Sequence, residues 1–160
     1  MRIERAENAS ISTPEQGQFF HIPTEHFDQH RPAIEFVLKQ AEQWTQVISS
    51  DELCELLKNG KMHAWGVLHA SGQLSLAITR LAEGVRGLLC TMWLFVPMTA
   101  QNDAAIGELL RNVERFARTQ GASALEIVTA PWMRQSSHLA AVKHTAATFE
   151  LDLRQSRSVN

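Results

Sequence analysis

Two histidines in the N-terminal third of the chain, His26 and His30, have a spacing that can present two imidazoles to a metal ion. An i,i+4 interval places both rings on one face of a helix, and Glu25 and Asp28 add carboxylates beside them. No third ligand follows at a fitting interval, and polar side chains in the opening turns of a helix are usually solvated. We therefore predict no metal site.

Other side chains that could act chemically lack a supporting partner in the sequence. His63 and His69 share one face of a predicted strand, where they either line a cleft or bond to backbone or water at its rim. Ser136 and His138 can be combined with several acids into a serine triad, but no nucleophile-elbow sequence surrounds the serine. Cys90 lies in an apolar run without a neighbouring base, so we interpret it as a core residue.

The stretch that organises the chain, residues 85–121, predicts a buried strand, a polar turn and an amphipathic helix. Both alternating faces of residues 88–96 are apolar, which is typical of a strand in the middle of a sheet. After Pro97 and a polar turn, apolar residues recur at helical spacing until Gly121. Because the first amides of a helix have no internal partner, this turn is a potential anion site.

The N-terminal half predicts one strand and two helices. The strand covers residues 17–23 and ends at a proline. The first helix covers residues 25–44, is capped by Thr24 and restarts at Pro32. A short second helix begins at the capping box Ser49–Glu52.

Strands dominate the rest of the prediction. Residues 63–70 and 73–81 form a hairpin, and a second tight turn at residues 82–84 returns the chain into the central strand. Another strand covers residues 124–130. A last helix capped by Ser136 or Ser137 and a half-exposed edge strand follow, and the predicted edge strand covers residues 149–153.

The element order is therefore β-α-α-β-β-β-α-β-α-β, which predicts an α/β fold with a mixed sheet and helices on both faces. The strands joined by tight turns are expected to be antiparallel, and the strand–helix–strand step is expected to be parallel and right-handed. We predict one domain over residues 17–153, with an N-terminal arm over residues 1–16 and a disordered tail over residues 154–160.

The composition excludes some classes of partner. The chain has 160 residues, of which 15 are basic and 17 acidic, so 15 − 17 = −2 and no net field attracts nucleic acid or a membrane surface. We find neither an N-terminal signal nor an apolar run that could span a bilayer, and we expect a cytoplasmic protein. Cys54 and Cys90 fall in apolar patterns, as expected for reduced core cysteines.

The element order, together with residues 96–122 (VPMTAQNDAAIGELLRNVERFARTQGA), resembles the Gcn5-related N-acetyltransferase (GNAT) superfamily. In that family the last residues of the strand bind pantetheine through backbone groups. The loop, usually (Q/R)-x-x-G-x-(G/A), wraps the pyrophosphate at the helix N-terminus. The resemblance implies a GNAT-like acyl-CoA N-acyltransferase fold, acetyl-CoA as cofactor, and a small molecule or protein amine as acceptor.

Carried over to this chain, the resemblance implies a cofactor site on the central strand and the loop that follows it. Its implied residues are Leu94, Phe95, Val96, Asn102, Ala104, Ala105, Ile106 and Gly107. Asp103 departs from the motif, because a carboxylate beside a pyrophosphate is electrostatically unfavourable. An acidic residue in the first turn of a helix is, in contrast, stabilised by the helix dipole.

Acetyl transfer to an amine also requires a group that accepts the ammonium proton. The positions at which several family members carry a carboxylate are apolar here, and the chain has no tyrosine to serve as the family's acid. The remaining candidates for a catalytic base are Glu83 in the turn before the central strand, Glu126 on the next strand, and His69.

Two hypotheses remain open. The first is an acetyl-CoA dependent N-acetyltransferase that binds its cofactor mainly through backbone groups. The alternative is a catalytically inactive GNAT-fold protein that serves as an interaction or structural module, for example a phage-encoded one acting in the host cytoplasm or virion, as a homo-oligomer or in a protein assembly. A third possibility is a different α/β binding domain.

Overall fold

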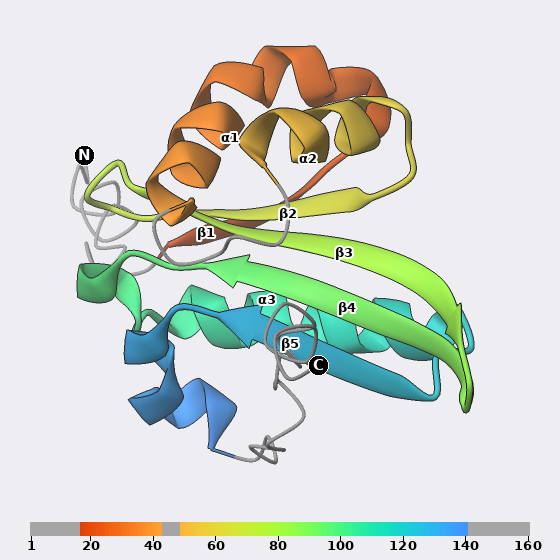
Figure 1. Ribbon diagram of the computed structural model, residues 1–160. Helices are drawn as coiled ribbons and strands as arrows, with labels where there is room; N and C mark the ends of the chain where they lie inside the picture. The colour runs from red at the N-terminus through yellow and green to blue at the C-terminus, as the bar shows by residue number, and fades with distance from the viewer. Residues whose placement is uncertain (1–16, 43–48, 141–160) are drawn as a thin grey trace, which may run out of the picture.

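The computed structural model describes residues 17–42 and 49–140, which fold into one five-stranded sheet with helices on both faces (Figure 1). The strands are β1 (Gln18–Ile22), β2 (His63–Leu68), β3 (Leu74–Gly84), β4 (Gly87–Phe95) and β5 (Ala124–Thr129). The α-helices are α1 (Phe27–Ala41), α2 (Ser50–Lys58) and α3 (Ala104–Thr119). Short 3-10 helices are η2 (Thr24–His26), η3 (Met98–Ala100), η4 (Pro131–Gln135) and η5 (Ser137–Leu139).

The sheet has the strand order β1-β2-β3-β4-β5, with antiparallel pairing from β1 to β4 and parallel pairing of β4 with β5. The predicted mixed sheet is confirmed. One turn differs from the prediction, because β3 continues to Gly84 and the turn consists of Val85 and Arg86. Gly84 pairs with Gly87, whose φ of +111° suits glycine, so a two-residue connection can follow the twist of the strands.

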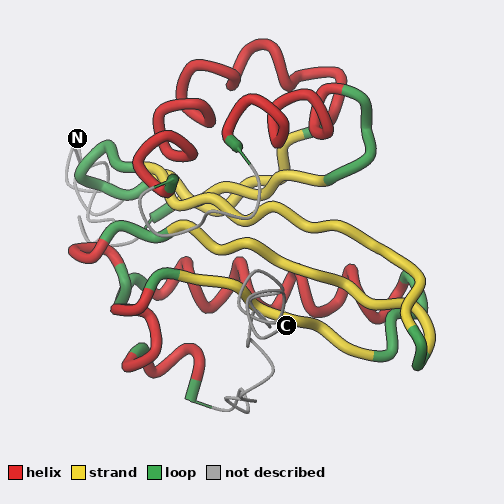
Figure 2. The backbone as a smooth tube through the Cα atoms, viewed as in Figure 1, coloured by secondary structure: helices red, strands yellow, loops and turns green. Residues whose placement is uncertain are grey.

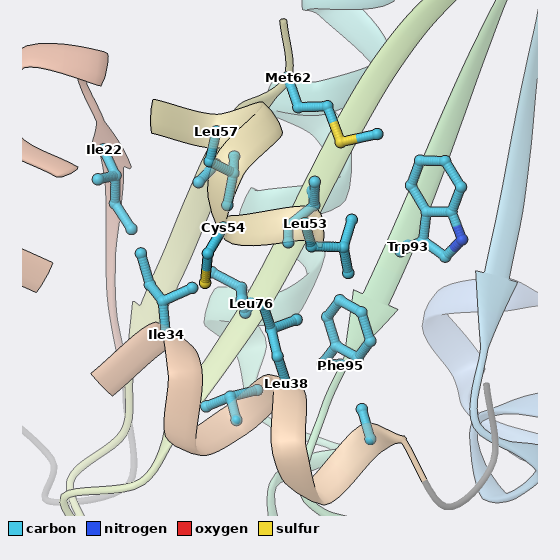
Figure 3. Close-up of a cluster of buried hydrophobic side chains, with 14 of the residues drawn as sticks. Ile22, Ile34, Leu38, Leu53, Cys54, Leu57, Met62, Leu76, Trp93 and Phe95 are labelled. Atoms are coloured by element: carbon cyan, nitrogen blue, oxygen red, sulfur yellow. The ribbon is translucent and has the colours of Figure 1, made fainter. Parts of the chain in front are cut away.

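The two faces of the sheet are covered by different helices: α1 and α2 lie on one face and α3 on the other (Figures 1 and 2). On the first face, Trp93 and Phe95 of β4 pack with apolar side chains of both covering helices, such as Leu38 and Leu53 (Figure 3). On the second face, residues of β4 with the opposite parity pack on α3; these are Met92, Leu94 and, just beyond the strand, Val96. The alternation predicted for residues 88–96 is therefore confirmed.

The start of the first helix differs from the prediction. Thr24 does not cap it: the residue lies inside η2, and no side chain caps either η2 or α1. Pro32 does not restart the helix, because α1 continues through it. A proline without an amide hydrogen removes one helical hydrogen bond there but does not end the helix. The N-cap half of the capping box of α2 is confirmed, since Ser49 Oγ accepts from the Glu52 amide at 3.2 Å.

After β5 the chain forms two 3-10 helices. Ser136 caps η5 by accepting from the His138 amide at 3.3 Å, so the predicted cap is present on a shorter and tighter helix. The remainder of the predicted last helix, the edge strand at residues 149–153, the arm and the tail lie outside the described residues. Within the described part of the chain, no helix is long and apolar enough to cross a membrane.

Candidate functional site

The predicted site lies where β4 ends, η3 turns the chain, and α3 begins. Leu94, Phe95 and Val96 are all buried at the end of the strand. Asn102 and Ala104 are exposed, and α3 begins at Ala104 with Asp103 as its N-cap. The other three predicted residues, Ala105, Ile106 and Gly107, form the buried side of its first turn.

Asp103 is the most connected polar side chain of this site. Its carboxylate accepts from the Ala105 amide at 3.0 Å and from the Gly17 amide at 3.1 and 2.9 Å. It also lies 2.6 Å from Nδ1 of His69, and only 6% of its side chain is exposed. Burial alone would raise the pKa of Asp103, but the hydrogen bonds from Ala105, His69 and Gly17 lower it. Asp103, which the sequence placed in the first turn of α3, is instead its N-cap, and its side chain is a buried anion.

His69 is buried and holds both ring nitrogens in hydrogen bonds. Nδ1 faces Asp103, and Nε2 lies 2.5 Å from Oγ of Ser75, which is itself fully buried. The order serine–histidine–aspartate is that of a hydrolytic triad. Because Ser75 has no exposed surface, the arrangement instead ties the β2–β3 hairpin to the first turn of α3. His69 is 6% exposed, so its ring lies inside the molecule, bonded to Asp103 and Ser75.

Gly17 completes this cluster, and the sequence offered no signal for it. A Cβ atom at this position would lie 2.7 Å from Cγ1 of Val67 and 2.8 Å from Oδ2 of Asp103. The glycine therefore allows the backbone to approach the carboxylate closely. The start of β1 is fastened to the start of α3 through this contact.

The parallel strands β4 and β5 stay paired up to Leu94 and Thr129. Oγ1 of Thr129 donates to the carbonyl of Leu94 at 3.1 Å, and Nε1 of Trp132 donates to the carbonyl of Val96 at 3.0 Å. Two backbone acceptors of the predicted cofactor site therefore accept from the chain itself. Thr129 and Trp132 were missed because only the fold brings them to β4.

The segment that carries Trp132 also reaches α3. His138 lies against Gly107, where a Cβ atom would be 3.2 Å from its Nδ1 and 3.3 Å from Nη1 of Arg111. Oγ of Ser136 donates to the carbonyl of Gln101 at 3.4 Å. Ser136 and His138, considered in the sequence as members of a triad, thus act here as contacts to the start of α3.

The other two candidate bases lie away from this end of the sheet. Glu83 is exposed on β3 opposite Leu88, beside the β3–β4 turn (Figure 1). Phe95 lies seven positions after Leu88 along β4, roughly 23 Å at about 3.3 Å per residue. Glu126 is half-buried in the middle of β5, where Thr91 donates to it at 3.5 Å.

Of the side chains considered for metal or thiol chemistry, His26 is exposed, His30 is half-buried and Cys90 is buried. The ring of His30 lies 5.9 Å from that of Phe20, and no group of three potential metal ligands occurs within residues 17–42 and 49–140. Cys90 is fully buried, and burial raises the pKa of its thiol, which confirms it as a core residue.

Comparison with known proteins identifies the fold. No family model and no curated protein matches the sequence. The structure is similar to a predicted acetyltransferase with acetyl-CoA from Clostridium acetobutylicum, with 13% identity, a TM-score of 0.62 and coverage of 88% of this chain and 98% of that chain. It is also similar to an aminoglycoside acetyltransferase in complex with sisomicin from an uncultured soil metagenomic sample, with 11% identity, a TM-score of 0.53 and coverage of 89% and 86%. The chain has the fold of GNAT-type acetyltransferases.

Acetyl-CoA does not fit this site as the described residues stand. A pyrophosphate at the N-terminus of α3 would meet the carboxylate of Asp103, which already uses the Ala105 amide. A pantetheine arm between the ends of β4 and β5 would compete with the bonds that Thr129 makes to Leu94 and Trp132 makes to Val96. The GNAT-type fold is thus combined with an acidic N-cap on α3 and with side-chain bonds to the end of β4.

Proposed function

We propose that this chain is a GNAT-fold protein that does not use acetyl-CoA and acts as an interaction or structural module. The observation that carries the proposal is the buried carboxylate of Asp103 at the N-terminus of α3. A helix N-terminus attracts one anion through its free amides and its dipole. Here that anion belongs to the protein, so a phosphate would have to displace it or accept its repulsion.

The absence of a usable base among the three candidates points the same way. His69 is buried behind the fully buried Ser75, Glu83 lies at the opposite end of β4, and Glu126 lies in mid-strand. Without a group that accepts the ammonium proton, a bound thioester would not be attacked efficiently. A module of this kind acts through its surface, as a homo-oligomer or within a protein assembly.

A second function is supported by a specific observation. Gly107 matches the final glycine of the family's loop motif, and it lies on the buried side of the first turn of α3. One protein of the same fold is described with acetyl-CoA. The second candidate is therefore an acetyl-CoA dependent N-acetyltransferase that acts on an amine after its site has rearranged.

A thermal-shift titration of the full chain with acetyl-CoA separates the two functions. A ligand at a hundred times its dissociation constant adds about 2.7 kcal/mol to the free energy of unfolding. We expect no shift for the wild type at millimolar acetyl-CoA. Asp103→Asn is the matched variant, because asparagine keeps a capping oxygen but removes the charge. A saturable shift of the wild type would support the acetyltransferase instead.

A further inference from the structure

We propose that residues Ala130 to Ala140, here called the cover segment, are a built-in occupant of the cofactor position and keep acetyl-CoA out of it. The inference deepens the proposed function, because it names the part of the chain that replaces the ligand. The cover segment comprises η4, η5 and the residues beside them, and in Figure 1 it lies at the C-terminal ends of β4 and β5.

The first contact of the cover segment is with the end of β4. Trp132 donates its indole N–H to the carbonyl of Val96 at 3.0 Å, one residue beyond the strand. Thr129, directly before the segment, donates to Leu94 at 3.1 Å. A ligand that entered between β4 and β5 would first have to break both bonds and replace them with bonds of its own.

The second contact is with the start of α3. Ser136 donates to the carbonyl of Gln101, and His138 lies against the face of Gly107. A Cβ atom at Gly107 would be 3.2 Å from Nδ1 of His138, which is closer than ordinary van der Waals contact. The space left by the missing side chain of Gly107 is therefore filled by the imidazole of His138.

Apolar anchors make the cover segment part of the folded core. Ala130 and Met133 are fully buried, and Leu139 is 4% exposed. Met133 and Leu139 belong to the apolar cluster that α3 forms with β4. Removal of such side chains from water is favourable and roughly proportional to their apolar area. The cover segment is thus packed in place and is not a loose flap.

One point of the cover segment is weakly held. Nε2 of His138 and Oε1 of Gln101 are buried polar atoms without a hydrogen-bond partner among the described residues. Such atoms lose their bonds to water and gain nothing in return. Replacement of His138 by alanine removes one of them and opens the face of Gly107. The variant His138→Ala is therefore the least disruptive way to open the cover.

The experiment measures acetyl-CoA binding by isothermal titration calorimetry to four full-length proteins. They are the wild type, Asp103→Asn, the double variant Asp103→Asn/His138→Ala, and the double variant Asp103→Asn/Arg134→Ala. Arg134 is exposed within the same segment and serves as the control. The informative comparison lies within the Asp103→Asn background, because the carboxylate repels phosphate whether or not the cover is open.

We expect the variant with His138→Ala to bind acetyl-CoA at least about tenfold more tightly than Asp103→Asn alone, which corresponds to about 1.4 kcal/mol. The variant with Arg134→Ala should equal Asp103→Asn. Trp132→Phe in the same background is a second test, because it removes the bond to Val96 and keeps an aromatic ring. Circular dichroism must show that each variant is folded.

The outcomes separate the inference from the proposed function. If neither His138→Ala nor Trp132→Phe, each added to Asp103→Asn, increases the affinity for acetyl-CoA above that of Asp103→Asn alone, the cover segment is not the occupant. The proposed function then stands. If the wild type binds acetyl-CoA, and adding His138→Ala to Asp103→Asn still improves binding, the proposed function is wrong and the cover segment is confirmed as the occupant. If the wild type binds and neither variant improves binding, both are wrong.

Discussion

The two faces of the sheet differ in how they are held together. The face under α1 and α2 is closed by a cluster of buried apolar side chains (Figure 3). The face under α3 has an apolar cluster too, but it also contains the buried polar residues His69, Ser75 and Thr79. All three make hydrogen bonds to side chains.

The two faces of the sheet contribute differently to the fold and to any specific function of the chain. Apolar packing is non-directional and tolerates many sequences, so the first face carries little beyond the fold. Buried polar groups are costly unless each one is satisfied, so a connected polar cluster marks a place with a specific requirement. Here that place is the start of α3, where the Asp103 carboxylate bonds to Gly17, His69 and Ala105.

The largest effect is expected from Asp103→Ala on the polar face. The substitution removes the cap of α3 and leaves the Gly17 amide and the His69 ring without their partner. Each buried group left without its hydrogen-bond partner costs about 1–3 kcal/mol, and the lost cap adds about 1 kcal/mol. Urea denaturation followed by circular dichroism measures the loss. A loss below about 1 kcal/mol, the typical value of a cap alone, would show that the cluster does not hold the fold.

The apolar face gives the matching measurement. Leu53 of α2 is 4% exposed in the cluster of Figure 3, and Leu53→Ala should cost about 2–5 kcal/mol. The control is Leu56→Ala on the same helix, which is only partly buried and should cost less. The loss of unfolding free energy caused by Leu53→Ala should be the same at pH 7 and pH 3.5, since no titrating group is removed. The loss caused by Asp103→Ala should differ between these two pH values.

The sequence predicts the two faces unequally. Local periodicity determines the strand, so the alternation in residues 88–96 was sufficient to predict it. A local hydrogen bond determines the start of α2, so the Ser49 motif was sufficient to predict that helix. Asp103 was assigned to the start of α3 for the same reason, although the structure places it at the N-cap and not in the first turn. Its bonds to Gly17 and His69 span 86 and 34 residues, and no local pattern reports contacts of that kind. Thr129 and Trp132 were missed for this reason as well.

A smaller effect is expected from Gly17→Ala. The added methyl group would lie 2.7 Å from Val67 and 2.8 Å from Asp103, so β1 or the carboxylate must move. Overpacking of this kind typically costs about 1–3 kcal/mol. Gln18→Ala, at an exposed neighbouring position, is the control and should change little. Equal stability of the two variants in urea would show that Gly17 and Asp103 are not in close contact.

The smallest expected effect is on the pH dependence of stability, and it belongs to the polar face alone. The hydrogen bonds of Asp103 lower its pKa in the folded state relative to its ordinary value of 3.8. At this carboxylate the unfolded chain therefore binds a proton more readily than the folded chain. Ionised Asp103 thus stabilises the folded state, and this stabilisation is present above about pH 4. It is lost as the pH falls through the folded pKa. Asp103→Asn, which cannot titrate, should lose less stability than the wild type between pH 5 and pH 3, a window set by that lowered pKa.

Urea denaturation at intervals of half a pH unit measures this difference. Glu114→Gln is the matched control, because Glu114 is an exposed carboxylate of α3 in an ion pair with Arg118. Exposed pairs contribute little, so this variant should follow the wild type closely. Parallel curves for Asp103→Asn and the wild type would mean that the carboxylate is solvated, and the polar face would then be held by packing alone, like its neighbour.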